Sequence, residues 1–478
     1  MKRAVVVSIV LAWVILSFFL VSYVIADDGW ANLGLYGGQI YEIAIDPDDV
    51  NKMFAGAFYG DGLYRTLDGG DSWEPVLTGE EGGALDGEAT FRNTAVWKVR
   101  IAPTSDGNPD NNTIWAVHNY WAAKSSSGGA DNTWLHISND AMQDDCTNCP
   151  NDSTSSQPGS EQFRYCTALA IDPSDPQTVY VGTGGAYSSD KEGAVYKTTD
   201  GGSKWTKMGL FYPAFDPDTA FPDDPCCSYE PRDLDKEFYS KVVALVVHPM
   251  KSNIVWAVDF NEKLGDYLSV LYISDNGGKD WNHKVGLGAF MGESGLVVKP
   301  DEPNVIFMGT FLGIVRIEFK LDNQGNFNRY SNVNLSFPIG WGSGKNIRAL
   351  AFDQQNNNIL YASAGLDSNF KLLKSSDGGL SFPDEYSHDQ QYTHLAPHPT
   401  NSNVIFGGDR LLGLFQNNFS NNTYTWSALN SGIQSIRIND IATDSNNSDH
   451  YLAATMAGLF EYTGVTDQWY GISQSVFN

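Results

Sequence analysis

Ten side chains of the types that bind carbohydrate lie in the polar stretches of this 478-residue sequence. They are Tyr59, Asp61, Glu88, Tyr120, Trp121, Tyr187, Glu192, Glu262, Trp341 and Arg410. Sugar rings stack on aromatic faces, and their hydroxyl groups need short polar partners. A glycosidase would also need two carboxylates at a set separation across its site. Carboxylates are present but no pair is singled out, so the residue types favour ligand binding over hydrolysis.

A pattern of the form Ser/Thr-x-Asp-x-Gly-x-x-Trp occurs four times, each time between two apolar segments. Its defining residues are Thr66, Asp68, Gly70 and Trp73; Thr198, Asp200, Gly202 and Trp205; Ser274, Asn276, Gly278 and Trp281; and Ser375, Asp377, Gly379 and Phe382. The hydroxyl and carboxylate groups can accept hydrogen bonds from turn N–H groups, and glycine tolerates positive φ. The pattern therefore predicts hairpin turns. Ser138-Asn139-Asp140 resembles half of a further copy.

A second signature occurs eight times: an apolar strand ending in Asp-Pro or a similar pair, a polar turn, and an aliphatic strand. The prolines or equivalent positions are 47, 103, 173, 249, 300, 354, 399 and 445, at intervals of 45 to 76 residues. A third strand, such as Leu63–Thr66, precedes most boxes, and a fourth begins at the box tryptophan. One such unit cannot bury both its faces, so the units must stack radially.

The predicted fold is therefore all-β: a single β-propeller of four-stranded antiparallel blades that spans residues 27–478. Eight repeats favour eight blades, and seven result if one repeat is not a blade. Trp30–Gly34 resembles a fourth strand with no repeat before it and is a candidate to complete the last blade. The segment at Trp469 competes for that place.

The run of residues 43–73, with Ile-Ala-Ile-Asp-Pro followed by Gly-Leu-Tyr-Arg-Thr-x-Asp-Gly-Gly-x-x-Trp, resembles the Asp-box (BNR) repeat superfamily. Sialidases, xyloglucan-active glycosidases, sortilin-type receptors and photosystem II assembly factors belong to it. The resemblance, over about residues 30–473, implies that the boxes and the Asp-Pro turns share one face and that ligands bind on the opposite face. It also implies that the box aspartates, with His248 and His398 at the Asp-Pro position, are structural. The ten candidate ligand-binding residues fall in connections of the opposite face.

Several activities of that superfamily lack their residues in this chain. A sialidase needs an early Arg-Ile-Pro motif and three arginines that grip a carboxylate, but Arg100-Ile101-Ala102-Pro103 reads as a strand. Xyloglucan-active enzymes carry a catalytic Asp in a Thr-Asp-Val-Gly-Gly segment, where this chain has an ordinary box at Asp68. The resemblance is therefore specific for fold and uninformative about activity.

The formal charge of −27 argues against nucleic acid and against anionic membrane surfaces as partners, because both require a basic face. Acidic loops are able to bind calcium, although the sequence has no EF-hand spacing. No other cofactor and no metal site is indicated.

Residues 1–26 begin with Lys2 and Arg3, continue as an apolar run and end in Val24-x-Ala26, which predicts a signal peptide or a membrane anchor. The remainder is then secreted or exposed at the cell surface. In that compartment disulfides are expected in two inserted loops, at about 139–166 and 211–240, that hold Cys146, Cys149, Cys166, Cys226 and Cys227. Glycosylation sequons begin at Asn111, Asn151, Asn334, Asn418, Asn421 and Asn446.

Two hypotheses about function follow. The first is an extracellular binding or structural propeller that recognises a glycan or a protein through the face opposite the boxes. Self-association by exchange of an end strand is a variant of it. The alternative is a secreted, inverting glycoside hydrolase that acts on a polysaccharide, which requires two carboxylates roughly 6.5–9.5 Å apart.

Overall fold

The computed structural model describes residues 37–58, 62–76, 91, 95–118, 122–136, 142–143, 166–184, 193–211, 239–263, 266–281, 283–286, 295–310, 313–319, 333–339, 346–366, 369–388, 392–409, 412–420, 423–429, 434–435, 438–444, 447–455, 458–463 and 468–471. The chain divides into two compact units. One is Tyr36–Arg437, and the other combines Met1–Leu35 with Ile438–Asn478. Within the described ranges, no helix is long and apolar enough to cross a membrane.

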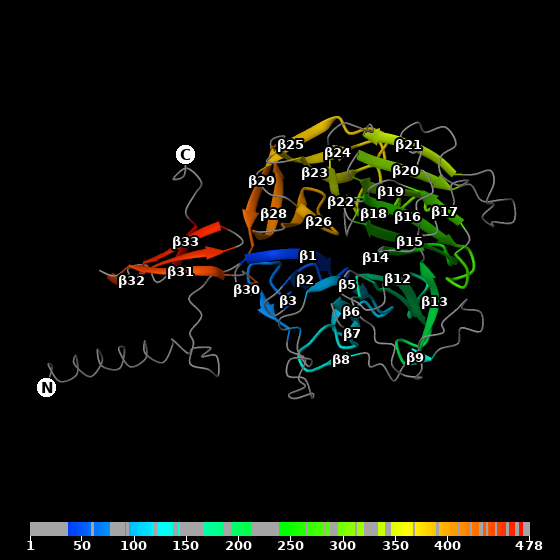
Figure 1. Cartoon of the computed structure of the whole chain (residues 1–478), viewed down its shortest axis with the longest axis horizontal. Coiled ribbons are helices and arrows are strands. Elements are labelled where there is room, and N and C mark those ends of the chain that lie inside the picture. The colour runs from blue at the N-terminus through cyan, green and yellow to red at the C-terminus, as the bar shows by residue number, and fades with distance from the viewer. Residues whose placement is uncertain are drawn as a thin grey trace. The chain divides into compact units, whose positions relative to one another are not determined.

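The described part of Tyr36–Arg437 holds seven antiparallel sheets, which follow one another around a ring in the order of the repeats (Figure 1). Blade one contains β1 (Gly37–Ile45), β2 (Met53–Phe58), β3 (Leu63–Thr66) and β4 (Glu74–Pro75). Blade two contains β5 (Val96–Ala102), β6 (Thr113–His118), β7 (Ala122–Ser125) and β8 (Trp134–His136), with the short 3-10 helix η1 (Pro109–Asn111) between its first two strands. Blade three contains β10 (Ala168–Asp172), β11 (Asp175–Gly182), β12 (Gly193–Thr198) and β13 (Trp205–Phe211).

The remaining blades repeat this meander. Blade four contains β14 (Tyr239–His248), β15 (Lys251–Lys263), β16 (Asp266–Ser274) and β17 (His283–Gly286). Blade five contains β18 (Leu296–Val298), β19 (Val305–Thr310), β20 (Gly313–Phe319) and β21 (Val333–Ile339). Blade six contains β22 (Asn346–Phe352), β23 (Leu360–Leu366), β24 (Asn369–Ser375) and β25 (Asp384–His388). Blade seven contains β26 (Tyr392–Pro397), β27 (Val404–Asp409), β28 (Gly413–Ser420) and β29 (Thr423–Ala428).

Two short strands add to these blades in parallel. β9 (Met142–Gln143) pairs with β13, and β30 (Gln434–Ser435) pairs with β1. The eighth repeat forms a four-stranded antiparallel sheet of its own in the other unit. Its strands are β31 (Ile438–Asp444), β32 (Asn447–Thr455), β33 (Gly458–Thr463) and β34 (Gln468–Gly471). The meander predicted for each repeat is thus confirmed.

The ring closes by packing of blade one against blade seven. Ile40, Ile43 and Tyr64 are buried in one cluster with Val404 and Phe406. Every other pair of neighbouring blades has a buried apolar cluster of the same kind among the described residues. The ring therefore has seven blades, the lower of the two predicted numbers, because repeats one and seven already cover each other's faces. Trp469 lies in β34, which belongs to the other unit, and Trp30–Gly34 lies outside the described residues.

The four predicted boxes are hairpin turns between third and fourth strands. In the first, the Gly70 N–H donates to Thr66 Oγ1 at 3.0 Å, and the Ser72 N–H donates to Asp68 Oδ1 at 2.9 Å. Hydrogen bonds from Ser72 and Thr66 hold the pKa of Asp68 at about 2. Gly69 and Gly70 have φ of 75° and 100°, a region that favours glycine. The box aspartate is therefore engaged within its own turn.

Blade two has a box that the sequence pattern missed. The N–H groups of Ser127 and Gly129 both donate to Ser125 Oγ at 3.2 Å, and Trp134 is buried behind them. Ser127 stands where the other boxes have Asp or Asn, and two extra residues precede the tryptophan. This turn corrects the assignment of the second box to Ser138-Asn139-Asp140, which lies outside the described residues.

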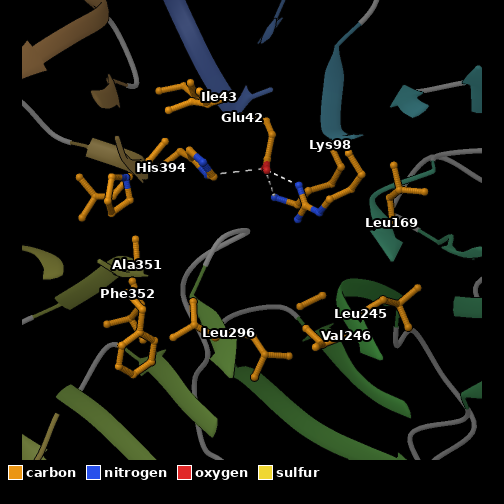
Figure 2. A pocket seen from close by; sticks show the side chains of 18 of the residues that line it. Glu42, Ile43, Lys98, Leu169, Leu245, Val246, Leu296, Ala351, Phe352 and His394 are labelled. Atoms are coloured by element: carbon orange, nitrogen blue, oxygen red, sulfur yellow. Dashed lines mark hydrogen bonds and ion pairs between the residues drawn. The ribbon is translucent and has the colours of Figure 1, made fainter. Parts of the chain in front are cut away.

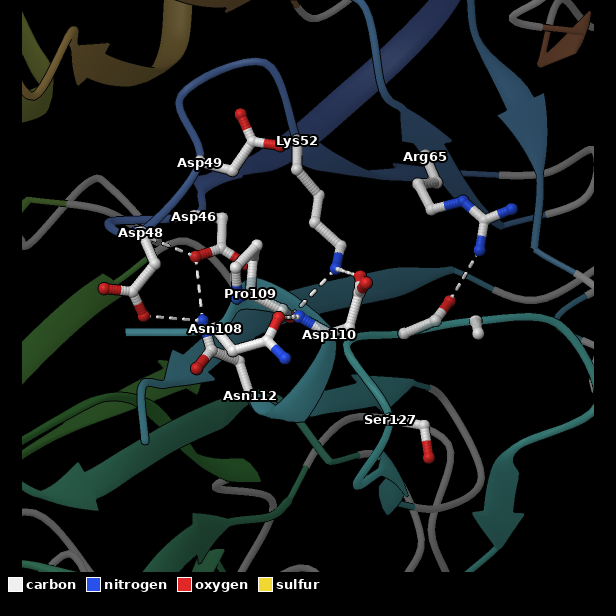
Figure 3. A network of polar contacts seen from close by, with 12 residues as sticks. Asp46, Asp48, Asp49, Lys52, Arg65, Asn108, Pro109, Asp110, Asn112 and Ser127 are labelled. Carbon is white, nitrogen blue, oxygen red and sulfur yellow. Dashed lines mark hydrogen bonds and ion pairs between the residues drawn. The ribbon is translucent and has the colours of Figure 1, made fainter. Parts of the chain in front are cut away.

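The Asp-Pro turns join the first and second strands of a blade, at the same ends of the strands as the boxes. They also form hydrogen bonds to the neighbouring blade. Asp46 Oδ1 accepts from the Asp48 N–H of its own turn at 3.0 Å and from Asn112 Nδ2 of blade two at 2.8 Å (Figure 3). Beside this pair, Lys52 Nζ donates to the Pro109 carbonyl at 2.9 Å. Equivalent contacts join Asp172 to Ser252 and Asp353 to Ser402.

His248 and His398 take the place of this aspartate, as predicted. The N–H of Met250 donates to His248 Nδ1 at 3.1 Å, and that of Thr400 donates to His398 Nδ1 at 3.2 Å. Both rings must leave Nδ1 unprotonated to accept, and burial lowers the pKa of each. These histidines therefore act as turn acceptors.

Cys166 departs from the prediction that it lies in an inserted loop and is a disulfide candidate, whereas the odd number of cysteines already implied one thiol without an intramolecular partner. Cys166 is a free, fully buried thiol in the apolar cluster between blades two and three, next to Trp115 and Leu169. It occupies a core position because it precedes β10, where other repeats have Ile40 or Val96, and burial raises the pKa of its thiol. Cys146, Cys149, Cys226 and Cys227 lie outside the described residues.

A seven-bladed ring predicts that residues 36–437 fold without the eighth repeat. We expect this fragment to unfold in urea in one cooperative transition followed by tryptophan fluorescence, because each of its blade faces is covered. As a control, a fragment that ends at residue 391 removes blade seven and exposes Ile40 and Ile43, and should lose the transition. Non-cooperative unfolding of 36–437 would contradict ring closure by blades one and seven.

The second prediction concerns the close packing of box turns on the preceding blade. A Cβ on Gly129 would lie 2.4 Å from Phe54 Cζ, whereas a Cβ on Gly107 would meet nothing within 4 Å. Both glycines have positive φ, 75° and 66°. Gly107→Ala should cost about 1 kcal/mol in unfolding free energy through φ alone. Gly129→Ala should cost roughly 1–3 kcal/mol more through the clash. Equal costs in urea titrations would refute the packing argument.

Candidate functional site

The first strands of all seven blades line a central cavity of about 290 Å³. Five of these strands carry a β-bulge at the same place, where the register shifts between Ile40 and Glu42, Val96 and Lys98, Val242 and Ala244, Ile347 and Ala349, and Tyr392 and His394. A bulge sets two residues opposite one and re-aims a side chain. The residues that follow these bulges include Glu42, Lys98 and His394, which reach the cavity.

Those three side chains meet in the cavity together with Arg100. Lys98 Nζ donates to Glu42 Oε2 at 3.0 Å, and Arg100 Nη1 donates to Glu42 Oε1. His394 Nδ1 lies 3.6 Å from Glu42 Oε2 and has no hydrogen-bond partner among the residues that the structure describes. Figure 2 shows Glu42 between Lys98 and His394, with the apolar side chains of Leu245, Leu296 and other labelled residues across the cavity. The ring thus brings one carboxylate and three basic side chains together from blades one, two and seven.

The cluster holds Glu42 ionised. Burial opposes the charged form of this residue, which is 2% exposed, but Arg100, His394 and Lys98 outweigh burial and lower the pKa of Glu42 to about 2. Desolvation lowers the pKa of His394 to about 4, so its imidazole is neutral at neutral pH. Glu42 is therefore unsuited to donate a proton as a general acid, a role that needs a raised pKa.

An aromatic cluster lies at the ends of the strands opposite the boxes. The ring centroids of Tyr41 and Trp97 are 4.6 Å apart, those of Phe58 and Trp97 are 6.0 Å apart, and Lys241 Nζ lies 4.4 Å from the Trp97 ring centroid. All four side chains are partly exposed. Tyr41 and Trp97 are the bulge residues that precede Glu42 and Lys98, so the bulges supply both the aromatic pair and the charges.

Buried polar residues hold the connections on that same side. They are His118, Thr310 and Asp409, which end β6, β19 and β27, together with Thr183, which directly follows β11, and Asp259, which lies within β15. The Leu412 N–H donates to Asp409 Oδ1 at 2.7 Å, and Thr310 Oγ1 donates to the Gly313 carbonyl at 3.0 Å. The connections between second and third strands are thus anchored to the ring at their bases.

The predicted ligand-binding residues fall mainly outside the described structure. These are Tyr59, Asp61, Glu88, Tyr120, Trp121, Tyr187, Glu192, Trp341 and Arg410. Glu262 lies in β15, where its backbone pairs with Tyr239 and Tyr267. Of the sequons, Asn111 and Asn418 are exposed and Asn334 lies in β21, while Asn151, Asn421 and Asn446 lie outside the described residues. No group of three or more His, Cys, Asp or Glu side chains in the described ranges could hold a metal ion.

Sequence reasoning missed the charged cluster, although a signal was present. Five residues before the Pro position, other repeats carry Ala168, Ala244, Gly295 and Ala349, whereas repeats one, two and seven carry Glu42, Lys98 and His394. A charge at a position that is otherwise small, within an apolar strand, indicates a paired or functional group. The bulges that aim these side chains have no comparable signature in the sequence.

Comparisons with known proteins do not assign this chain to a family. No protein-family model matches the chain, and no curated protein sequence matches it. Similar solved structures include the GH74 xyloglucanase from Xanthomonas campestris, with 15% identity over 91% of this chain and 64% of that chain and a TM-score of 0.37. They include YCF48 from Cyanidioschyzon merolae, with 17% identity over 80% and 96% of the two chains and a TM-score of 0.41. They also include the Cps50 (Swd1) β-propeller domain from Myceliophteria thermophila, with 10% identity over 81% and 98% and a TM-score of 0.46. These similarities are too weak to indicate an activity.

The third prediction concerns stability in acid. Folding lowers the pKa of His394 from 6.5 to about 4. Between pH 4 and pH 6.5 the unfolded chain therefore binds a proton at this residue and the folded chain does not. Stability is therefore full above pH 6.5 and declines as the pH falls to about 4, by on the order of 3 kcal/mol. His394→Gln should remove this decline, as measured by urea unfolding at pH 4 to 7.

Glu42 provides the matched comparison, because its depressed pKa acts in a lower window. Its contribution is present above pH 4.5 and is lost as the pH falls to about 2. Glu42→Gln should flatten the stability profile below pH 4.5, whereas His394→Gln acts in that range only through the charge that it removes beside Glu42. Profiles of both variants that parallel the wild-type profile would show that the cluster does not control acid stability.

Proposed function

We propose that this protein is an extracellular binding propeller that recognises a glycan or a protein on the face opposite the Asp boxes. The observation that carries the proposal is the partly exposed cluster of Tyr41, Phe58 and Trp97 at that end of the strands. Exposed aromatic rings stack on sugar faces and form hot spots in protein interfaces. The cation of Lys241 over Trp97 adds a polar group beside these apolar faces.

The two faces of the ring differ in a way that supports this choice. On the box face, the polar groups of the turns are occupied by bonds within the turns and between blades, as with Asp46 and Asp68. The connections with the candidate aromatic and acidic residues depart from the other ends of the strands. Loops that are varied and anchored on a rigid scaffold are where binding residues concentrate. Secretion or surface exposure and self-association belong to the same proposal and rest on the N-terminal sequence and the repeated end segments.

Hydrolysis ranks second because the charged cluster does not suit it. Glu42 is the one carboxylate that lines the cavity in the described structure, and its pKa of about 2 keeps it ionised. An inverting hydrolase needs a second carboxyl group whose pKa is raised, roughly 6.5–9.5 Å away. No such second carboxyl group lines the cavity among the described residues.

The fourth prediction tests binding directly. The protein should bind members of a glycan array or capture a specific protein from the native cell surface. Trp97→Ala should reduce that binding about tenfold or more, because a central aromatic anchor is worth roughly 1–3 kcal/mol. The control is Leu67→Ala on the box face, where Leu67 is 59% exposed.

The outcomes separate the alternatives. Binding that Trp97→Ala weakens and Leu67→Ala leaves unchanged supports recognition on the face opposite the boxes. Silence on the array and in the capture experiment contradicts the proposal, as does binding that responds only to Leu67→Ala. Release of reducing ends from a bound polysaccharide would favour the hydrolase.

A further inference from the structure

Arg100 has an unused hydrogen-bonding edge in the central cavity. Its Nη1 group is fixed by Glu42 and by the Val99 carbonyl at 2.8 Å. Its Nε and Nη2 groups make no hydrogen bond or ion pair with the described residues, although the residue lines the cavity and its side chain is 38% exposed. Lys98, which is 3% exposed, uses its ammonium for Glu42 alone among the described residues.

The Nε–Nη2 edge of an arginine matches a carboxylate in geometry, because two parallel N–H groups meet two oxygens. An arginine held at one nitrogen loses little side-chain freedom on binding, so it is already oriented for this contact. The charges also favour an anion. Lys98 and Arg100 are balanced by one carboxylate, and His394 is neutral, so one positive charge remains in excess.

Most of the other residues that line the cavity are apolar, and Gln354 is the polar exception. Leu245, Leu296, Ala351 and Phe352 line it from blades four, five and six, across from Glu42 (Figure 2). A cavity of about 150 Å³ accommodates benzene, so a volume of about 290 Å³ has room for a compact ring or branched chain together with an anionic group. Water would hydrogen-bond to the charged side chains but would interact weakly with the apolar residues across the cavity. A ligand with an apolar part would therefore fit this cavity better than water alone.

We propose that the central cavity binds a small organic carboxylate whose carboxyl group pairs with Arg100 and whose compact apolar body packs on the aliphatic wall of blades four to six. This site goes beyond the proposed recognition of a glycan or protein, since it uses the inside of the ring and not its rim. It takes a different class of ligand and can be present whether or not the rim binds a partner.

The experiment is calorimetric titration of the full chain with benzoate and with 3-methylbutanoate. Benzamide and 3-methylbutanol serve as uncharged probes of nearly the same shape, and chloride serves as an anion without an apolar body. We expect saturable binding of the two carboxylates, and binding of the uncharged probes at least about tenfold weaker. Arg100→Lys, which keeps the charge but loses the fork, should weaken carboxylate binding about tenfold or more.

Two further variants keep the test decisive if Arg100→Lys lowers stability. Ala351→Leu fills part of the apolar wall without changing charge, and should weaken 3-methylbutanoate and benzoate binding together. Lys371→Met is the matched control, because it removes a cation from the surface pair with Glu385 and should leave binding unchanged. Circular dichroism and urea unfolding verify that each variant is folded.

The proposal is overturned by several results. These are absence of carboxylate binding up to millimolar concentration, equal binding of charged and uncharged probes, binding of chloride as strong as that of benzoate, or binding that survives both Arg100→Lys and Ala351→Leu. None of these outcomes bears on the glycan and protein experiments at the rim, so failure of one proposal leaves the other standing.

Discussion

Packing of each blade face on the next is the interaction on which this structure depends. A four-stranded meander is apolar on both faces, and burial of roughly 25 cal/mol per Å² of apolar surface is available only when another blade covers it. The ring supplies a cover for every blade when Ile40 and Tyr64 of blade one meet Phe406 of blade seven. The four-stranded meander of each blade comes from one continuous segment, so closure rests on side-chain packing, on polar contacts between neighbouring turns and on the pairing of β30 with β1.

Those polar contacts occupy many of the hydrogen-bonding groups on the box face. Each box turn satisfies its own N–H groups, and the Asp-Pro turns join neighbouring blades through pairs such as Asp46 with Asn112. A ligand that bound these polar groups would first have to break their existing hydrogen bonds, which would cost free energy. The opposite ends of the strands carry partly exposed aromatic rings, and the connections that leave them are anchored by residues such as Asp409 and Thr310.

The bulges link the scaffold to the candidate sites. Each adds one residue to a first strand before that strand lines the cavity. In blades one and two the extra residues are Tyr41 and Trp97, and the residues that follow are Glu42 and Lys98. A single backbone irregularity therefore places an aromatic ring at the rim and a charge in the cavity. Blades one and two therefore carry most of the charged side chains that line the cavity, together with His394 of blade seven.

The sequence alone determined the local features of this protein. Box turns and strand meanders follow from short-range hydrogen bonding and glycine conformation, which depend on neighbouring residues. Tertiary structure decided the rest. Seven blades close because repeats one and seven fit face to face, a geometric condition that counting repeats does not reveal. Glu42, Lys98 and Arg100 meet His394 only because the ring brings together positions more than 290 residues apart. Cys166, grouped with the loops by its spacing, is buried for the same reason: its surroundings come from a neighbouring blade.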